Sequence, residues 1–158
     1  IILGCAPKRA PAYAFKAGGN GLLTEADTAW VSGDDVNSRD VSSDVATPLF
    51  YRNRFCIMNS DRKAMTCVEP KTGKLFWEYR VEGGAKIECS PTAADGRIYF
   101  MDQRGKVTVL AAGDEAKLLH EADFGGPGEK DIRSSIAIAG GNLFIRTNTA
   151  LFCVGAKD

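Results

Sequence analysis

Short runs of mostly apolar residues recur along this chain, separated by polar residues typical of turns, and this pattern predicts β-strands rather than helices. In one segment, Ser90–Ala94 and Arg97–Asp102 flank Asp95-Gly96, a dipeptide typical of two-residue hairpin turns. The same frame begins 43 residues upstream at Thr47 and 45 residues downstream at Ser135. A β-rich repeat of about 40–50 residues predicts the blades of a β-propeller.

The repeat groups fourteen expected strands into two complete antiparallel four-stranded blades and two partial blades. The complete blades span 47–81 and 90–122, and the partial blades span 1–32 and 135–155. The fold class is therefore all-β, with 1–158 as a single partial propeller domain. The expected strands are 1–5, 12–17, 28–32, 47–51, 55–59, 64–69, 74–81, 90–94, 97–102, 106–111, 117–122, 135–139, 142–147 and 150–154.

Two complete and two partial blades do not close a ring, since propellers usually contain about 4–8 complete blades. The first unit lacks an inner strand, and the last lacks an outer strand. Because unpaired edge strands invite pairing with other chains, self-association through the open blade edges is one expectation. The other is that the chain forms the C-terminal part of a larger propeller.

Composition narrows the range of partners. The 20 Lys and Arg residues balance the 20 Asp and Glu residues, and neither a basic excess nor a basic stripe indicates a nucleic-acid partner. No apolar run reaches the roughly 18 residues that a membrane span requires. Leu3-Gly4-Cys5-Ala6 resembles a lipidation signal, but the repeat frame favours a strand at this position.

The five cysteines contain no Cys-x-x-Cys pair, which argues against a zinc site or a thioredoxin-type redox site. We interpret them as small buried hydrophobic residues. A pairing of Cys56 with Cys67 across a hairpin is the less favoured alternative. The cysteines are Cys5, Cys56, Cys67, Cys89 and Cys153.

One segment carries a recognisable motif, Cys67-Val68-Glu69-Pro70-Lys71-Thr72-Gly73-Lys74-Leu75-Phe76-Trp77. Thr72-Gly73 favours a tight turn, and four residues later Trp77 offers a large aromatic surface. The segment resembles the tryptophan-docking motif of pyrroloquinoline-quinone-like propellers, Ala-x-Asp-x-x-Thr-Gly-x-x-x-Trp. Here Cys67 and Glu69 replace the Ala and the Asp.

The resemblance implies that Thr72, Gly73 and Trp77 form a structural docking site between blades. Trp30 lies 47 residues before Trp77 and is expected to play the same role one blade earlier. The third blade has Ala112-Gly113 at the corresponding turn but no tryptophan. Its docking is therefore expected to be degenerate.

The resemblance also frames the function. Similar propellers include dehydrogenases that hold a quinone and calcium, and non-catalytic scaffolds, among them periplasmic lipoproteins that assist outer-membrane protein assembly. No catalytic constellation appears in this chain, so we expect a non-catalytic scaffold that binds a protein or small ligand and needs no cofactor. The resemblance implies a periplasmic or extracellular location.

The alternative is the C-terminal part of a quinoprotein-like dehydrogenase or sugar-acting enzyme. In that case pyrroloquinoline quinone and calcium would be the cofactors, and the active residues would lie in other blades. The two interpretations differ in whether cofactor addition stabilises the protein.

Three further groups of candidate site residues each have a functional and a structural interpretation, and we favour the structural one. Asp34–Asp40 with Asp44 offers oxygen ligands for calcium, but it lacks the glycine and glutamate of an EF-hand loop and fits a polar surface loop. His120, the only histidine, is expected on the solvent side of an outer strand. Arg133 and Arg146 offer binding groups for a carboxylate or an acidic peptide, but structural salt bridges are the favoured interpretation.

Overall fold

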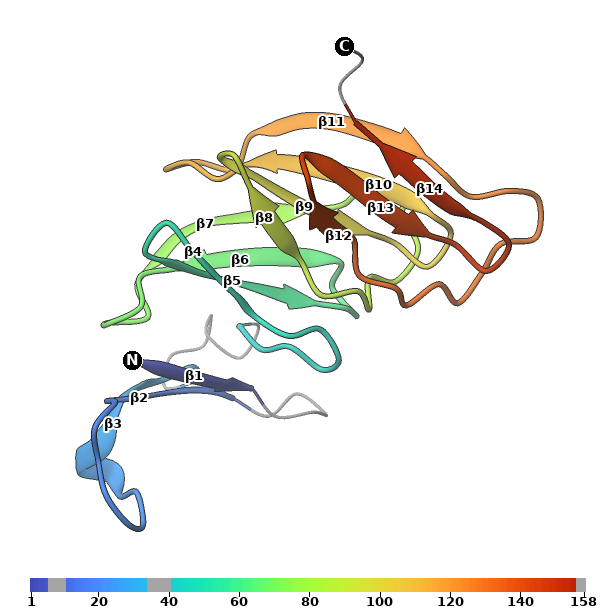
Figure 1. Ribbon diagram of the computed structural model, residues 1–158. Coiled ribbons are helices and arrows are strands. Elements are labelled where there is room, and N and C mark those ends of the chain that lie inside the picture. Colours follow the sequence, from blue (N-terminus) through green and yellow to red (C-terminus); the bar gives the residue numbers. More distant parts are fainter. Residues whose placement is uncertain (6–10, 34–40, 156–158) are drawn as a thin grey trace.

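The computed structural model describes residues 1–5, 11–33 and 41–155. Four antiparallel sheets follow one another in chain order from the N-terminus to the C-terminus (Figure 1), and we call them blades 1 to 4. Blades 1 and 4 have three strands each, and blades 2 and 3 have four. Within each blade, strands adjacent in sequence are paired. The all-β fold class, with two complete and two partial blades, is confirmed.

The described strands agree in number and order with those expected from the repeat. Blade 1 holds β1–β3, blade 2 β4–β7, blade 3 β8–β11 and blade 4 β12–β14. Their bounds are β1 Ile2–Cys5, β2 Ala12–Phe15, β3 Thr28–Val31, β4 Leu49–Tyr51, β5 Arg54–Asn59, β6 Ala64–Val68, β7 Leu75–Arg80, β8 Thr92–Ala94, β9 Arg97–Met101, β10 Lys106–Ala111, β11 Leu118–Asp123, β12 Ala137–Ala139, β13 Asn142–Arg146 and β14 Leu151–Val154.

The inner strands are shorter than the pattern predicted. In blade 3 the sequence suggested a start at Ser90, whereas β8 begins at Thr92. The backbone N–H of Ser90 bonds the Ser135 side chain of blade 4, so this residue takes part in contacts between blades. A short 3-10 helix at Glu25–Asp27 was also not expected; the Asp27 carboxylate accepts a bond from the N–H of Thr24, 2.9 Å away.

The turns between the first two strands of blades 2, 3 and 4 share one geometry. Asp95 and Gly96 have φ of 48° and 74°, which places both in the left-handed region. Arg52-Asn53 and Gly140-Gly141 occupy the same place in their blades and also have positive φ. Two consecutive left-handed residues match the twist of the flanking strands, as the Asp95-Gly96 signal predicted.

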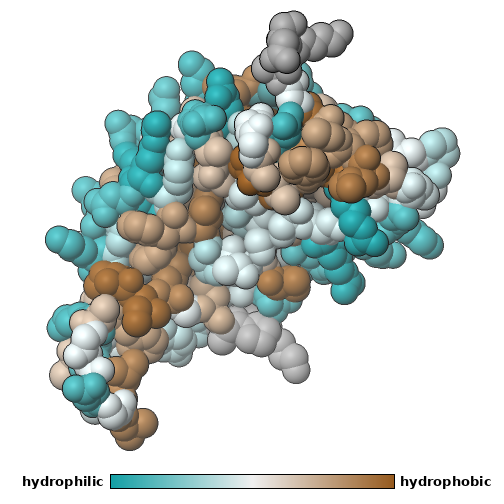
Figure 2. Space-filling view, viewed as in Figure 1, coloured by the Kyte–Doolittle hydropathy of each residue, from teal (hydrophilic) through white to brown (hydrophobic). Residues whose placement is uncertain are grey.

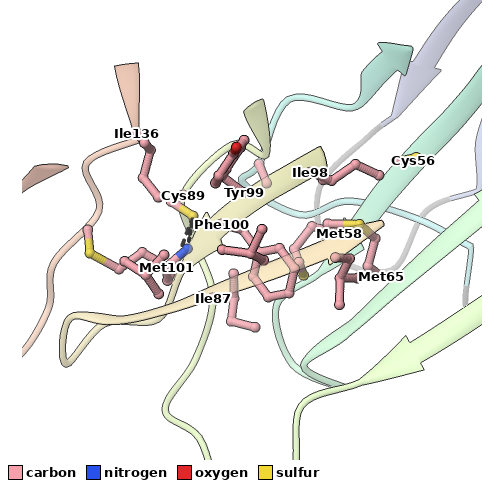
Figure 3. Close-up of a cluster of buried hydrophobic side chains, with 14 of the residues drawn as sticks. Cys56, Met58, Met65, Ile87, Cys89, Ile98, Tyr99, Phe100, Met101 and Ile136 are labelled. Carbon is pink, nitrogen blue, oxygen red and sulfur yellow. Dashed lines mark hydrogen bonds between the residues drawn. The ribbon is translucent and has the colours of Figure 1, made fainter. Parts of the chain in front are cut away.

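The core lies between the blades. The middle strands β9 and β10 are buried on both faces, because another blade packs against each side. Phe100 and Met58 belong to one apolar cluster that extends from blade 2 to blade 4 (Figure 3). Within it the Cys89 thiol exchanges two 3.0 Å hydrogen bonds with the backbone of Met101.

The outer surface is mixed. Figure 2 shows hydrophilic side chains over much of the visible face, with apolar patches near the N-terminal and C-terminal blades. Exposed apolar residues with large side chains include Leu22, Phe50, Leu75 and Leu151. The exposed apolar side chains are thus spread over all four blades, and most of them belong to blades 1 and 2.

Truncation of a core aromatic tests this arrangement. Phe100 is 1% exposed, and we expect Phe100→Ala to lower the free energy of unfolding by about 3–5 kcal/mol, because it removes a buried ring and leaves a cavity. Phe50 is 57% exposed, and its one described ring contact is with Phe55. Phe50→Ala is therefore the matched control, and we expect it to lower the free energy of unfolding by less than about 1.5 kcal/mol. Urea titration measures both values, and equal losses would contradict a core between the blades.

Candidate functional site

The segment 69–74 folds into a closed turn around one carboxylate. Glu69 accepts hydrogen bonds from the backbone N–H of Lys71 at 2.9 Å and from the backbone N–H and hydroxyl of Thr72 at 2.6 and 2.8 Å. The N–H of Gly73 donates to the Glu69 carbonyl at 2.9 Å. Glutamate in place of the motif's aspartate therefore still binds the turn from within.

These bonds change the acidity of the carboxyl group. The pKa of Glu69 lies below its ordinary value of 4.5, first because of the hydrogen bond from the Thr72 hydroxyl and then because of the backbone N–H donors. Hydrogen bonds to the charged form favour ionisation. The Glu69 carboxylate of the folded turn is therefore ionised at neutral pH.

Trp30 of blade 1 lies on this turn of blade 2. Its indole Nε1 donates a hydrogen bond to the carbonyl of Pro70 at 2.9 Å. Gly73 has φ of +71°, and a Cβ atom added there would lie 2.7 Å from the Trp30 ring. Glycine is required here both by the backbone conformation and by the close approach of the indole.

Trp77 makes the corresponding contact one blade further on. It is 6% exposed, and its Nε1 donates to the Gly113 carbonyl of blade 3 at 3.1 Å. At the same junction the Arg54 guanidinium bonds the Asp114 carboxylate and lies over the Phe76 ring, 5.1 Å from its centroid. The turn that receives Trp77 is Ala112-Gly113, which no tryptophan follows in the sequence.

The third blade places His120 where blades 1 and 2 have tryptophan. In blades 1, 2 and 3 the residue at this position on the outermost strand pairs with a residue on the neighbouring strand. A β-bulge follows that partner residue in each of the three blades. The sequence alone indicates only weakly that His120 corresponds to the two tryptophans, because the correspondence requires both the repeat spacing and the position of the bulge. The paired residues are Ala14 with Trp30, Cys67 with Trp77, and Val109 with His120. His120 is exposed on β11.

A second set of contacts joins the blades at their inner ends, where β4, β8 and β12 are neighbours. The backbone N–H of Thr47 donates to Ser90 Oγ, and the N–H of Ser90 donates to Ser135 Oγ, both at 2.9 Å. Thr92 Oγ1 also donates to the Ile136 carbonyl at 2.7 Å. We call the Thr47–Ser90–Ser135 series the inner ladder. Sequence reasoning used these residues only to set the repeat and missed this role.

Charged side chains flank the inner ladder. Arg133 Nε lies 2.8 Å from Glu88 Oε2, so the favoured expectation of a salt bridge at Arg133 is confirmed. The Arg133 side chain is 67% exposed, whereas that of Glu88 is 12% exposed. Arg146 Nη1 lies 3.5 Å from the Ser134 hydroxyl. These residues give the inner end of blades 3 and 4 a polar surface with an accessible guanidinium.

The remaining candidates divide by position. Residues 34–40 of the calcium hypothesis lie outside the described residues, as does Ala6 of the lipidation-like segment. Across 1–5, 11–33 and 41–155 no group of three or more His, Cys, Asp or Glu side chains is arranged to hold a metal ion. In the same described part of the chain, no helix is long and apolar enough to cross a membrane.

The cysteines are not all buried. Cys56, Cys67 and Cys89 are buried as expected, but Cys5 is half-buried and Cys153 is exposed. Cys153 lies on β14, the outermost strand of blade 4 in the described part of the chain. Burial raises the pKa of Cys89 to about 11, as is usual for a thiol that serves as a packing residue.

One known protein family matches most of the chain, including both complete blades. The family described as outer membrane protein assembly factor BamB matches residues 19–158. The chain belongs to this family. The resemblance to pyrroloquinoline-quinone-like propellers is thereby confirmed. A comparison with curated proteins found no match.

Solved structures show the same fold. BamB from Moraxella catarrhalis is 15% identical, with a TM-score of 0.66 over 89% of this chain and 38% of that one. Quinohemoprotein alcohol dehydrogenase from Comamonas testosteroni is 16% identical, with a TM-score of 0.55 over 66% of this chain and 17% of that one. The europium-containing methanol dehydrogenase is 15% identical, with a TM-score of 0.53 over 77% and 23%. The chain therefore spans well under half the length of these relatives.

The seat of Trp30 gives a paired glycine test. We expect Gly73→Ala to lower the free energy of unfolding by about 1–3 kcal/mol, because alanine is strained at φ of +71° and its Cβ meets the indole. Gly113→Ala is the control, since a Cβ there meets nothing within 4 Å and the carbonyl that Trp77 uses is kept. Its effect is expected to stay within about 0.5 kcal/mol. Denaturant unfolding monitored by tryptophan fluorescence compares them; equal losses would refute a specific role for Gly73.

The Glu69 turn predicts a pH dependence. Because the folded-state pKa is lowered, the stabilisation is fully present above the ordinary value of 4.5 and is lost as pH falls through the folded-state pKa. We expect Glu69→Gln to be less stable than the natural protein at pH 7, and this difference in stability to shrink as the pH falls below 4.5. Thermal unfolding across this range measures the gap, with the exposed Glu115→Gln as control. A gap that is constant with pH would contradict the role of the ionised carboxylate.

Proposed function

We propose that the chain is part of an exported, non-catalytic propeller scaffold that binds a protein partner. The observation that supports this most directly is the family match over residues 19–158, whose description names an outer membrane protein assembly factor. Periplasmic location, as proposed for this chain, follows from the same kinship. A scaffold of this kind needs a rigid frame and a presenting surface.

The rigid frame comes from contacts at both ends of the blades. Trp30 and Trp77 donate hydrogen bonds to backbone carbonyls of the following blades. In the inner ladder, backbone N–H groups donate to serine hydroxyl oxygens of the following blades. Because each contact satisfies a polar backbone group as well as packing apolar surface, neighbouring blades are held in a fixed relative position. In this proposal Thr72, Gly73, Trp77 and Trp30 are structural docking residues rather than a ligand site.

The presenting surface is the polar inner end of blades 3 and 4. Arg133 is mostly exposed although it pairs with Glu88, and Arg146 lies beside Ser134. A guanidinium that is held in place at one nitrogen is suited to a carboxylate or an acidic peptide, because its planar donors match the oxygens. We therefore assign partner contact to this surface, with no resident cofactor in the proposal.

The assembly role predicts an outcome in the organism of origin. Loss of the gene is expected to lower the amount of assembled outer-membrane protein, and the natural gene is expected to restore it. A complementing copy with Arg133→Ala and Arg146→Ala should restore less, because both guanidinium groups on the presenting surface are gone. Exposed Lys117→Ala is the matched control and should restore fully. Full restoration by the arginine variant would refute this surface as the contact site.

Cofactor addition separates the scaffold from its alternative, the C-terminal part of a quinoprotein-like dehydrogenase or sugar-acting enzyme. A ligand that binds the folded state raises the melting temperature. For a scaffold, pyrroloquinoline quinone with calcium leaves the melting temperature of the full-length protein unchanged. A clear rise with the pair, and none with calcium alone, would favour the enzyme.

A further inference from the structure

Two cysteines meet inside blade 2. Cys56 on β5 and Cys67 on β6 are directly opposite each other in the antiparallel register. Their sulfur atoms lie 3.5 Å apart, and both side chains are at most 1% exposed. Cys67 also faces Trp77 on β7, so the two thiols lie in the row of side chains that ends at the docking tryptophan.

We propose that Cys56 and Cys67 are a redox site that closes to a cross-strand disulfide when the chain folds in the presence of a disulfide oxidant. The side chains already face each other, and closure needs only that the sulfurs approach to the bonding distance of about 2.05 Å. The cross-link joins β5 to β6, and β6 in turn pairs with β7, the strand that carries Trp77. It goes beyond the scaffold role and does not depend on it.

The chemistry is two successive exchanges. The thiolate of one cysteine attacks a small-molecule disulfide such as oxidised glutathione, which forms a mixed disulfide and releases one glutathione thiolate. The thiolate of the other cysteine then attacks the protein sulfur of the mixed disulfide and releases the second glutathione. Two electrons pass from the protein to the oxidant. The two thiol protons end on the released glutathione molecules.

Timing follows from the surroundings of the pair. In the folded protein the hydrogen bond with Cys67 and burial both raise the pKa of the Cys56 thiol, so little thiolate forms. The side chains are also closed to solvent. Exchange therefore takes place before blade 3 covers this face of blade 2. Once formed, the disulfide is protected from reductants by the same burial.

The other described cysteines lack this arrangement. Cys89 Sγ is engaged by the backbone of Met101 through two hydrogen bonds. Cys153 on β14 faces Phe144 across the strand pair, at the position that corresponds to Cys67 in blade 2. Its exposed thiol is thus an internal control for oxidation that needs accessibility but no facing partner.

Peptide mapping of the natural protein tests the site. The protein is unfolded with reductant, refolded in reduced and oxidised glutathione, alkylated, and cleaved with trypsin, which cuts after Arg62 and Lys63 between the two cysteines. We expect a linked pair of peptides, Phe55–Arg62 with Ala64–Lys71, lighter by two hydrogen atoms than the two free peptides together. Refolding with excess reductant should give both peptides alkylated.

Stability shows whether the bond suits the folded state. We expect the oxidised protein to melt about 5 °C or more above the reduced protein, because the cross-link restricts the unfolded chain. Cys153→Ala is expected to keep this difference, and Cys56→Ala with Cys67→Ala to abolish it. Recovery of Cys56 and Cys67 as free thiols after oxidative refolding, linkage to other cysteines instead, or a lower melting temperature on oxidation would each overturn the proposal.

Discussion

The two middle blades of this protein are apolar and buried on both faces, and that constraint determines the rest of the structure. β9 and β10 are buried on both sides, so neither face of blade 3 is stable in water. An antiparallel sheet with one wet face shows apolar and polar residues in strict alternation, whereas these strands are nearly continuous apolar runs. Burial therefore requires a blade on each side. The single cluster that extends from blade 2 to blade 4 is the result.

Packing alone leaves blades free to slide, because apolar contact has no direction. Polar contacts at the two ends of the blades fix their relative position. At the outer end the indole N–H of Trp30 and that of Trp77 reach single carbonyl groups in the next blade. At the inner end the hydroxyl groups of Ser90 and Ser135 accept backbone N–H donors from the preceding blade. Hydrogen bonds at two separated points define an orientation that dispersion forces do not.

The junctions are not equivalent, which is informative about the proposed scaffold. The first uses a glycine seat and a turn held by Glu69, the second adds the ion pair of Arg54 with Asp114, and the third has His120 at the tryptophan position. The third junction is instead held by hydrogen bonds from Ser90 and Thr92 to the segment of blade 4. Arg133 and Arg146 offer exposed charge beside it.

The sequence by itself determined the repeat, the fourteen strands, the hairpin at Asp95-Gly96 and the two tryptophans, because these depend on local periodicity and turn chemistry. The pattern placed the start of one strand too early, at Ser90, because the backbone of this residue bonds a neighbouring blade instead of continuing the strand. The pattern also missed the 3-10 helix at Glu25–Asp27, which is held by a local hydrogen bond from Thr24 to Asp27.

Only the tertiary structure decided which groups meet. The carbonyl partners of Trp30 and Trp77 lie 40 and 36 residues away, and the place of His120 depends on a bulge that shifts the register by one residue. The 3.5 Å approach of the Cys56 and Cys67 sulfurs likewise depends on the pairing of two strands. Pattern specifies which elements form, but distances between side chains follow from register and packing, to which residues distant in sequence contribute jointly.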